Sequence, residues 1–296
     1  MSHSLSLPSF AKINWTLRIL GRRDDGFHEL FTVFQTVSLC DTITFEQSDD
    51  VSVTCSDPAV PTDERNLVIK AARSLGRATN STRGAKLHLD KKIPSPGGLG
   101  GGSSNAAVTL IGLTRLWDLE ISDDILHELA ADLGSDVPFF LTGGTAIGTG
   151  RGEHVGQVDD LEVENLLLVT PDVAVSTGDA FERLAAPTLT FEERNRILTV
   201  CRNEADSLDL HHSVLRNDFE PSVFAAHPEI QRVKNSLLEL GAANAALSGS
   251  GGSVFASFDN KETRQAAQKA LDIESTWRKF AVSTISRSKY REALGL

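Results

Sequence analysis

The sequence predicts an α+β fold divided into two lobes. Strand-like and helical segments interleave along the 296 residues, but the first strand candidates follow one another as hairpins do. The chain also exceeds the roughly 150 residues typical of one domain. Near residues 150–164 it becomes rich in Gly and polar residues and then acidic. We therefore expect an N-terminal lobe over residues 1–160 and a C-terminal lobe over residues 161–296.

The individual elements are predicted from composition and periodicity. Six segments are expected to be strands: residues 10–20, 30–39, 42–46, 86–89, 166–170 and 254–258. Three segments are expected to be helices: residues 66–75, 105–117 and 125–133. The last of these stops before Gly134, a residue type that commonly ends helices.

Charge and composition exclude several classes of protein. The net charge of −11 does not suit a nucleic-acid binder, which usually carries a basic patch. No apolar run approaches the roughly 18 residues of a membrane helix, and the first residues lack the pattern of a secretory signal. Three cysteines without metal-ligand spacing suit a reducing compartment. We expect a cytoplasmic protein; nothing in the sequence predicts its oligomeric state.

A glycine-rich run carries the main chemical signal. Five of the six residues 97–102 are glycine, and Ser103, Ser104 and Asn105 follow, just before an apolar helix. Glycine lets backbone N–H groups approach a ligand closely, and the start of a helix attracts anions. The serine hydroxyls are also potential ligands for phosphate or Mg²⁺. This pattern predicts a polyphosphate site, although a flexible loop before a capped helix is the simpler alternative.

Other phosphate and hydrolase motifs do not fit. A Walker A loop requires a Gly-Lys pair, and the sequence has none. A dinucleotide fingerprint that starts at Gly98 would need glycine where Ser103 stands. No G-x-S-x-G nucleophile elbow occurs.

The run Pro94–Ala107 resembles the P-x-x-x-G-L-[GA]-[GS]-x-S-[SA] loop of the GHMP kinases. Four further blocks agree in order and spacing: Ala11–Asn14, Asp25–His28, Gly134–Pro138 and Leu247–Gly251. Asn66–Val68 and Asn217–Pro221 match lesser blocks, so the resemblance spans nearly the whole chain. It implies an N-terminal ATP-binding lobe like domain 2 of ribosomal protein S5 and a ferredoxin-like α/β C-terminal lobe that binds substrate.

The resemblance also implies how the nucleotide binds. ATP with Mg²⁺ would lie on the glycine-rich loop, and Ser103 would be a metal ligand. The residues expected to contact the nucleotide are Pro94, Gly97, Gly98, Leu99, Gly100, Gly101, Gly102, Ser103, Ser104 and Asn66. Pro96 stands where the most similar branch has Gly or Ala, and it offers no N–H.

Asp136 and Lys12 are the expected catalytic pair. On the bare sequence Asp136 is a turn or capping residue beside Gly134 and Pro138, and Lys12 is a lysine of an edge strand that faces water. By resemblance Asp136 accepts a proton from the substrate hydroxyl and Lys12 neutralises charge beside it. Asn14, two residues along the same strand face, is expected to position substrate.

The remaining expected contacts concern a cytidine-containing substrate. By resemblance the ring of Phe27 stacks on the base, His28 forms hydrogen bonds to it, and Phe181 covers its other side near Thr177. Phe27 stands where the family often has Tyr. Phe in place of Tyr keeps the stacking but loses any hydrogen bond of the hydroxyl. Gly249 and Ser250 are expected to close on the site from the second lobe.

The implied activity is ATP-dependent phosphorylation of the 2-hydroxyl of a cytidine diphosphate-linked sugar alcohol, a step of isoprenoid precursor synthesis. The implied partners are this substrate and ATP, with no nucleic acid and no membrane. Three alternatives remain: another small-alcohol kinase of the superfamily, such as a homoserine or mevalonate kinase; a catalytically silent binding protein on the same fold; and a nucleotide-binding module that is not a kinase, which ATP turnover would distinguish. The Phe27–His28 pair argues against the first, and the presence of both Lys12 and Asp136 against the second.

Overall fold

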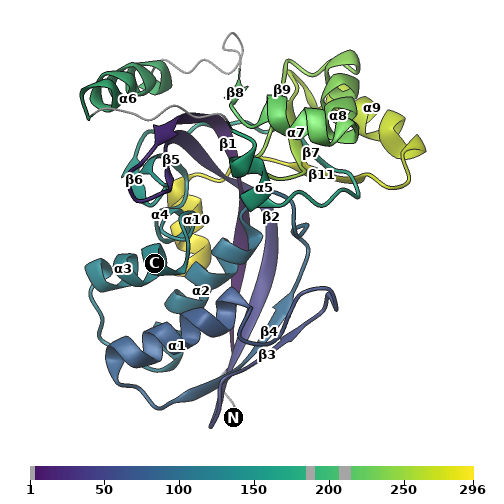
Figure 1. The fold of residues 1–296 in the computed structure, drawn as a ribbon. Coiled ribbons are helices and arrows are strands. Elements are labelled where there is room, and N and C mark those ends of the chain that lie inside the picture. Colours follow the sequence, from purple (N-terminus) through teal and green to yellow (C-terminus); the bar gives the residue numbers. More distant parts are fainter. Residues whose placement is uncertain (1–3, 185–190, 207–214) are drawn as a thin grey trace.

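The computed structural model describes residues 4–184, 191–206 and 215–296. Its strands form two sheets, each covered by helices; in Figure 1 the second sheet lies at the upper right, and the first extends from the bottom of the view to its top. Two long strands, β1 and β2, extend from near the N-terminus to the upper part of the view. No helix in these residues combines the length and the apolar composition that a membrane span requires.

The first sheet has seven strands, with β3-β4-β2-β1-β8 in order; β5 pairs with β2, and β6 pairs with β5. Their bounds are β1 Leu5–Arg22, β2 His28–Ser48, β3 Ser52–Cys55, β4 Gly84–Asp90, β5 Thr145–Gly150, β6 His154–Gln157 and β8 Arg216–Asn217. The two segments predicted at 30–39 and 42–46 are one strand, because a shift in the β1–β2 register between Phe10 and Ala11 lets the ladder continue past the break.

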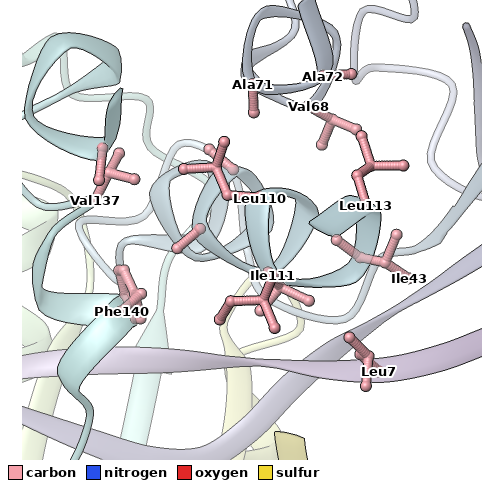
Figure 2. Packing of buried hydrophobic residues seen from close by; sticks show 14 of the residues in the cluster. Leu7, Ile43, Val68, Ala71, Ala72, Leu110, Ile111, Leu113, Val137 and Phe140 are labelled. Carbon is pink, nitrogen blue, oxygen red and sulfur yellow. The ribbon is translucent and has the colours of Figure 1, made fainter. Parts of the chain in front are cut away.

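Helices cover one face of this sheet. Their bounds are α1 Leu67–Thr79, α2 Gly101–Leu116, α3 Asp123–Leu133 and α4 Phe139–Thr142. Figure 2 shows α2 between α1 and the long strands, with Leu110 and Ile111 among the buried side chains. Gly112 permits this close packing, since a Cβ there would lie 2.4 Å from the ring of Phe45 in β2.

The second sheet is antiparallel, with strand order β11-β7-β10-β9. Its strands are β7 Leu166–Thr170, β9 Asn244–Leu247, β10 Val254–Ser257 and β11 Arg278–Val282. The helices of this part are α5 Thr177–Glu182, α7 Glu220–Ala226, α8 Pro228–Glu239 and α9 Lys261–Ala270, followed by a short 3-10 turn at Leu271–Ile273. Both faces are covered: Leu167 and Val169 pack in one cluster, whereas Leu166 and Leu168 pack in another with Trp15 of β1. This explains the uninterrupted apolar run of β7.

The chain crosses between the two sheets more than once. Helix α6, Phe191–Asp206, precedes β8, which pairs in parallel with β1. Helix α10, Arg287–Leu294, lies beside α2 and α4 in Figure 1, and its buried Tyr290 donates a hydrogen bond to the Phe140 carbonyl at 2.5 Å. The C-terminal segment therefore returns to the first core. A division of the chain at residue 160 remains a proposal.

Candidate active site

A cleft of about 970 Å³ is lined by residues of both parts of the molecule. Most of the residues singled out in the sequence line it: Lys12, Asn14, Phe27, His28, Pro94, Gly97, Gly98, Leu99, Gly100, Gly101, Gly102, Ser103, Asp136, Thr177, Phe181, Gly249 and Ser250. Segments far apart in the sequence thus meet at one cavity.

The glycine-rich loop is held in a conformation that requires glycine. Gly98 has φ +74°, and a Cβ there would lie 2.1 Å from the Ser248 carbonyl oxygen. Gly100 has φ +69° and is the N-cap of α2, and a Cβ on it would lie 2.9 Å from Cγ of Lys12. The first-turn residues Gly101, Gly102 and Ser103 line the cleft. The first N–H groups of a helix have no intrahelical partner, and they carry partial positive charge.

Helix α2 begins four residues before the predicted start at residue 105, because Gly100 takes the cap position in its left-handed conformation. Ser104 consequently lies inside the first turn and is not among the residues that line the cleft. Its side chain is fully buried, and Oγ accepts a hydrogen bond of 2.8 Å from Ser9. This burial does not favour a side-chain contact with nucleotide, and the contact of Ser104 stays a prediction.

Asn66 does not line the cleft either, although the next residue, Leu67, does. Its Oδ1 accepts from the N–H of Val68 at 2.9 Å, which caps α1, and its Nδ2 donates to the Pro61 carbonyl at 2.6 Å. Asn66 therefore caps α1, and each amide atom keeps one further donor or acceptor site. Its contact with nucleotide stays a prediction.

Lys12 and Asp136 meet in the middle of the cleft. Lys12 lies in the interior strand β1 and is 2% exposed, so the alternative of an edge lysine that faces water does not hold. Its Nζ is 3.4 Å from Oδ2 of Asp136, whose side chain is 33% exposed. Asp136 lies in the turn between α3 and α4, where Val137 N–H donates to the Gly134 carbonyl. A buried cation therefore faces a carboxylate that solvent still reaches.

The position of Lys12 is fixed on several sides. Its Nζ donates to Oδ1 of Asn14 at 2.7 Å, and Nδ2 of Asn14 donates to Oγ1 of Thr32 at 2.7 Å. The Lys12 N–H donates to the Leu99 carbonyl at 2.9 Å, which ties the strand to the glycine-rich loop. Because both ends of its amide have partners, Asn14 orients Lys12 directly, and this contact was not foreseen from sequence.

The loop between β9 and β10 closes the cleft from the second sheet. Ser248 Oγ donates to the Gly98 carbonyl at 3.0 Å, and a Cβ on Gly249 would lie 3.2 Å from Nζ of Lys12. The amide of Asn217 donates to the Gly249 carbonyl at 2.7 Å. Ser250 Oγ donates to Oγ1 of Thr177 at 3.2 Å. The loop between β9 and β10 therefore contacts the glycine-rich loop directly.

Aromatic side chains form the other end of the cleft. The rings of His28 and Phe181 are stacked with centroids 5.1 Å apart, and Phe219 meets Phe181 edge-on at 4.8 Å. Phe27 is 51% exposed, and the Arg151 guanidinium lies 4.8 Å from its ring centroid. Burial, and then the positive charge of Arg22, lower the pKa of His28 from its usual 6.5. The imidazole is therefore neutral at neutral pH and keeps both a donor and an acceptor.

Several lining residues were not predicted from the sequence, among them Arg22, Thr32, Phe34 and Arg151. Arg151 lies in the Gly-rich stretch that was interpreted only as a lobe boundary. Arg22 ends the first strand, and nothing in its local pattern distinguishes it from a surface arginine.

The donor set for a magnesium ion is small. No cluster of three or more His, Cys, Asp or Glu side chains suited to a metal occurs in the described part of the chain. Mg²⁺ commonly takes most of its ligands from water and from substrate phosphates, with only one or two from protein. Ser103 at the start of α2 and Asp136 both line the cleft and fit that limited role.

Two family profiles match the chain: "GHMP kinases N terminal domain" over residues 66–144 and "GHMP kinases C terminal" over residues 203–275. The chain belongs to the GHMP kinases. Its two-part α+β architecture is accordingly the GHMP kinase fold predicted from the sequence.

Comparison with individual proteins shows which GHMP kinases this chain resembles. A protein of Thermodesulfovibrio yellowstonii named 4-diphosphocytidyl-2-C-methyl-D-erythritol kinase is 40% identical, over 90% of this chain and 94% of its own. One of the same name from Chlorobium phaeobacteroides is 40% identical, over 92% of each. A crystal structure of 4-(cytidine 5′-diphospho)-2C-methyl-D-erythritol kinase has a TM-score of 0.75 and 29% identity, and the match covers 95% of this chain and 99% of that one. A homoserine kinase from Cytophaga hutchinsonii, with TM-score 0.73, 21% identity and coverage of 96% and 95%, shares the fold.

Proposed function

We propose that this GHMP kinase transfers a phosphoryl group from ATP to the 2-hydroxyl of 4-diphosphocytidyl-2-C-methyl-D-erythritol, in non-mevalonate isoprenoid precursor synthesis. One observation carries the proposal: the Lys12–Asp136 pair lies in the same cleft as a glycine-rich helix start and an aromatic group around His28. Relatives with this substrate in their names, at 40% identity, support the choice of alcohol.

The nucleotide is assigned to the glycine-rich side of the cleft. Its phosphates would meet the N–H groups of the first turn of α2, where the helix dipole favours negative charge. Gly98 and Gly100 let the backbone approach without a side chain between. Bound Mg²⁺ would neutralise phosphate charge, with Ser103 as its expected protein ligand.

The chemistry is assigned to Asp136 and Lys12. In the transfer, the bond between the γ-phosphorus and the bridging oxygen of ATP breaks, and a bond to the substrate oxygen forms. Asp136 accepts the proton of that hydroxyl, and its exposure lets the proton pass to water. The Lys12 ammonium, which Asn14 holds in place, stabilises negative charge on the reacting oxygens.

The aromatic end is assigned to the cytidine. A pyrimidine base has two faces for aromatic contact and polar edges for a neutral imidazole, and Phe27, His28 and Phe181 offer these partners. Arg22 and Arg151 line the same end, where a diphosphate would need cations. Homoserine and mevalonate have no base for this end to bind.

The test is ADP release from ATP and Mg²⁺ with four alcohols: 4-diphosphocytidyl-2-C-methyl-D-erythritol, homoserine, mevalonate and galactose. Release with the cytidyl substrate alone is the expected result. Release with another alcohol would support the proposed kinase activity and refute the assignment of the aromatic end to cytidine. ATP binding without release on any of the four would refute the kinase and favour a silent binding protein.

A further inference from the structure

Behind the glycine-rich loop, outside the cleft, lies a carboxylate with no contact to solvent. Asp41 of β2 is 0% exposed. Its Oδ1 accepts from the N–H groups of Lys92 at 2.7 Å and Ile93 at 2.9 Å. Its Oδ2 accepts from Nδ2 of Asn105 at 3.0 Å and forms an ion pair with the buried ammonium of Lys91. Asp41 thus binds two backbone and two side-chain donors at once.

These partners come from separate elements. Ser9 of β1 lies opposite Asp41 in the β1–β2 ladder. Its Oγ accepts from Nδ2 of Asn105 at 2.8 Å and donates to Oγ of Ser104 at 2.8 Å. Lys91 follows β4, and Asn105 and Ser104 belong to the start of α2. Asp41 and Ser9 therefore connect both long strands to the end of β4 and to α2.

Both ends of the nucleotide loop rest on this cluster. Ile93, bound by Asp41, immediately precedes Pro94, the first loop residue to line the cleft. At the other end, a Cβ on Gly101 would lie 3.2 Å from Nζ of Lys91 and 3.0 Å from Cγ2 of Ile93. The cluster therefore fixes where the loop begins and where the helix that follows it starts.

A buried ion pair is a weak way to stabilise a fold, since desolvation of the two charges offsets their attraction. Its donors and acceptors are directional, however, and they set the relative positions of the segments that they join. Binding of phosphate by backbone N–H groups depends on such placement, because small displacements of a site weaken its contacts. We propose that Asp41 is a positioning residue for the phosphates of the nucleotide, and that it acts through Lys92, Ile93 and Asn105. This inference rests on the proposed function, since it assumes that a nucleoside triphosphate occupies the loop.

A control carboxylate, partly buried, joins two other segments of the chain. Asp160 also bridges two backbone segments: its Oδ1 accepts from Thr145 N–H at 2.8 Å and its Oδ2 from Arg287 N–H at 2.7 Å. It joins β5 to the start of α10 and does not line the cleft. The substitutions Asp41→Asn and Asp160→Asn each replace one acceptor oxygen by an amide donor, and each does so at an aspartate that joins two chain segments. Only Asp41 contacts the residues next to the glycine-rich loop.

The experiment measures ATP affinity by titration calorimetry, and then KM for ATP, KM for the alcohol and kcat, with the full chain below its unfolding temperature. Asp41→Asn is expected to weaken ATP binding and raise KM for ATP by about tenfold, the effect of one lost hydrogen bond to a charged group. KM for the alcohol should change less than about twofold. Asp160→Asn should lower the melting temperature and leave both KM values near wild type. The inference would be overturned if Asp41→Asn left ATP affinity unchanged. It would also be overturned if Asp41→Asn and Asp160→Asn raised KM for ATP and KM for the alcohol to the same extent.

A gentler variant covers failure of Asp41→Asn to fold. Ser9→Ala removes the hydroxyl that joins Asn105 to Ser104 but retains the ion pair of Asp41. It is expected to weaken ATP binding several-fold with the same selectivity, and wild-type ATP affinity in a folded Ser9→Ala protein would refute the role of the cluster. The binding arm requires no alcohol. A wild-type protein that binds ATP but does not phosphorylate the cytidyl substrate would refute the proposed reaction while these variants still test Asp41.

Discussion

Substitution of Lys12 by Met removes one positive charge from the centre of the cleft with little change in volume. Lys12 is almost fully buried, and its ammonium has two polar neighbours: Oδ1 of Asn14 at 2.7 Å and Oδ2 of Asp136 at 3.4 Å. After the substitution the Asn14 oxygen loses its donor. Asp136 loses a cation but remains open to water.

The expected effects on stability and on rate differ in size. An unsatisfied buried acceptor costs about 1–3 kcal/mol, and relief of the desolvated ammonium offsets part of this, so the melting temperature should fall by only a few degrees. Loss of one preorganised group that stabilises transition-state charge lowers kcat by about 100- to 1,000-fold, or roughly 2.7–4 kcal/mol. The variant should therefore be folded and nearly inactive.

The assay is steady-state ADP release with saturating ATP and alcohol, beside a thermal melt of the same sample. Lys86→Met is the matched control, because Lys86 is an exposed lysine of β4 in the same sheet. It should keep wild-type kcat. A folded Lys12→Met protein with turnover close to wild type would refute the role assigned to Lys12.

Further predictions concern single features. Asp136→Asn should lower kcat by at least about 100-fold, as expected for a lost proton acceptor, with little change in melting temperature; wild-type kcat would refute its role. Because the pKa of His28 is lowered, acidification below about pH 6.5 protonates the unfolded chain first, so stability should fall there in thermal melts, and less so in His28→Ala; identical profiles would contradict this. Gly98→Ala should reduce ATP affinity measured by calorimetry, since its Cβ would meet the Ser248 carbonyl; unchanged affinity would contradict the close approach. Tyr290→Phe should lower the unfolding free energy by about 1–3 kcal/mol in urea titrations, because it leaves the Phe140 carbonyl unpaired; unchanged stability would contradict the docking of α10.

Local patterns in the sequence predicted those elements around the site whose conformation depends mainly on neighbouring residues. The strand at residues 166–170 agrees with β7, and the glycine-rich run lies at the start of α2 as expected. The identity of Gly98 and Gly100 follows from backbone conformations that only glycine adopts readily, so these residues carry a readable signal.

Other features depend on long-range contacts that no local pattern encodes. Asn66 has the form of a helix cap and of a family motif alike, and its bond to the Pro61 carbonyl could not be read from the local pattern. Asp41 lies in an ordinary strand, and its partners are 50 to 64 residues away. The return of α10 to the first core likewise depends on a fit between Tyr290 and Gly143.

The most direct test of the account is to identify the product. The purified protein would be incubated with ATP, Mg²⁺ and 4-diphosphocytidyl-2-C-methyl-D-erythritol, and the mixture analysed by ³¹P NMR and mass spectrometry. The account predicts a new phosphomonoester on the intact diphosphate-linked alcohol, formed in equal amount to ADP. ADP accompanied by inorganic phosphate alone, or phosphate attached to another position of the substrate, would contradict it.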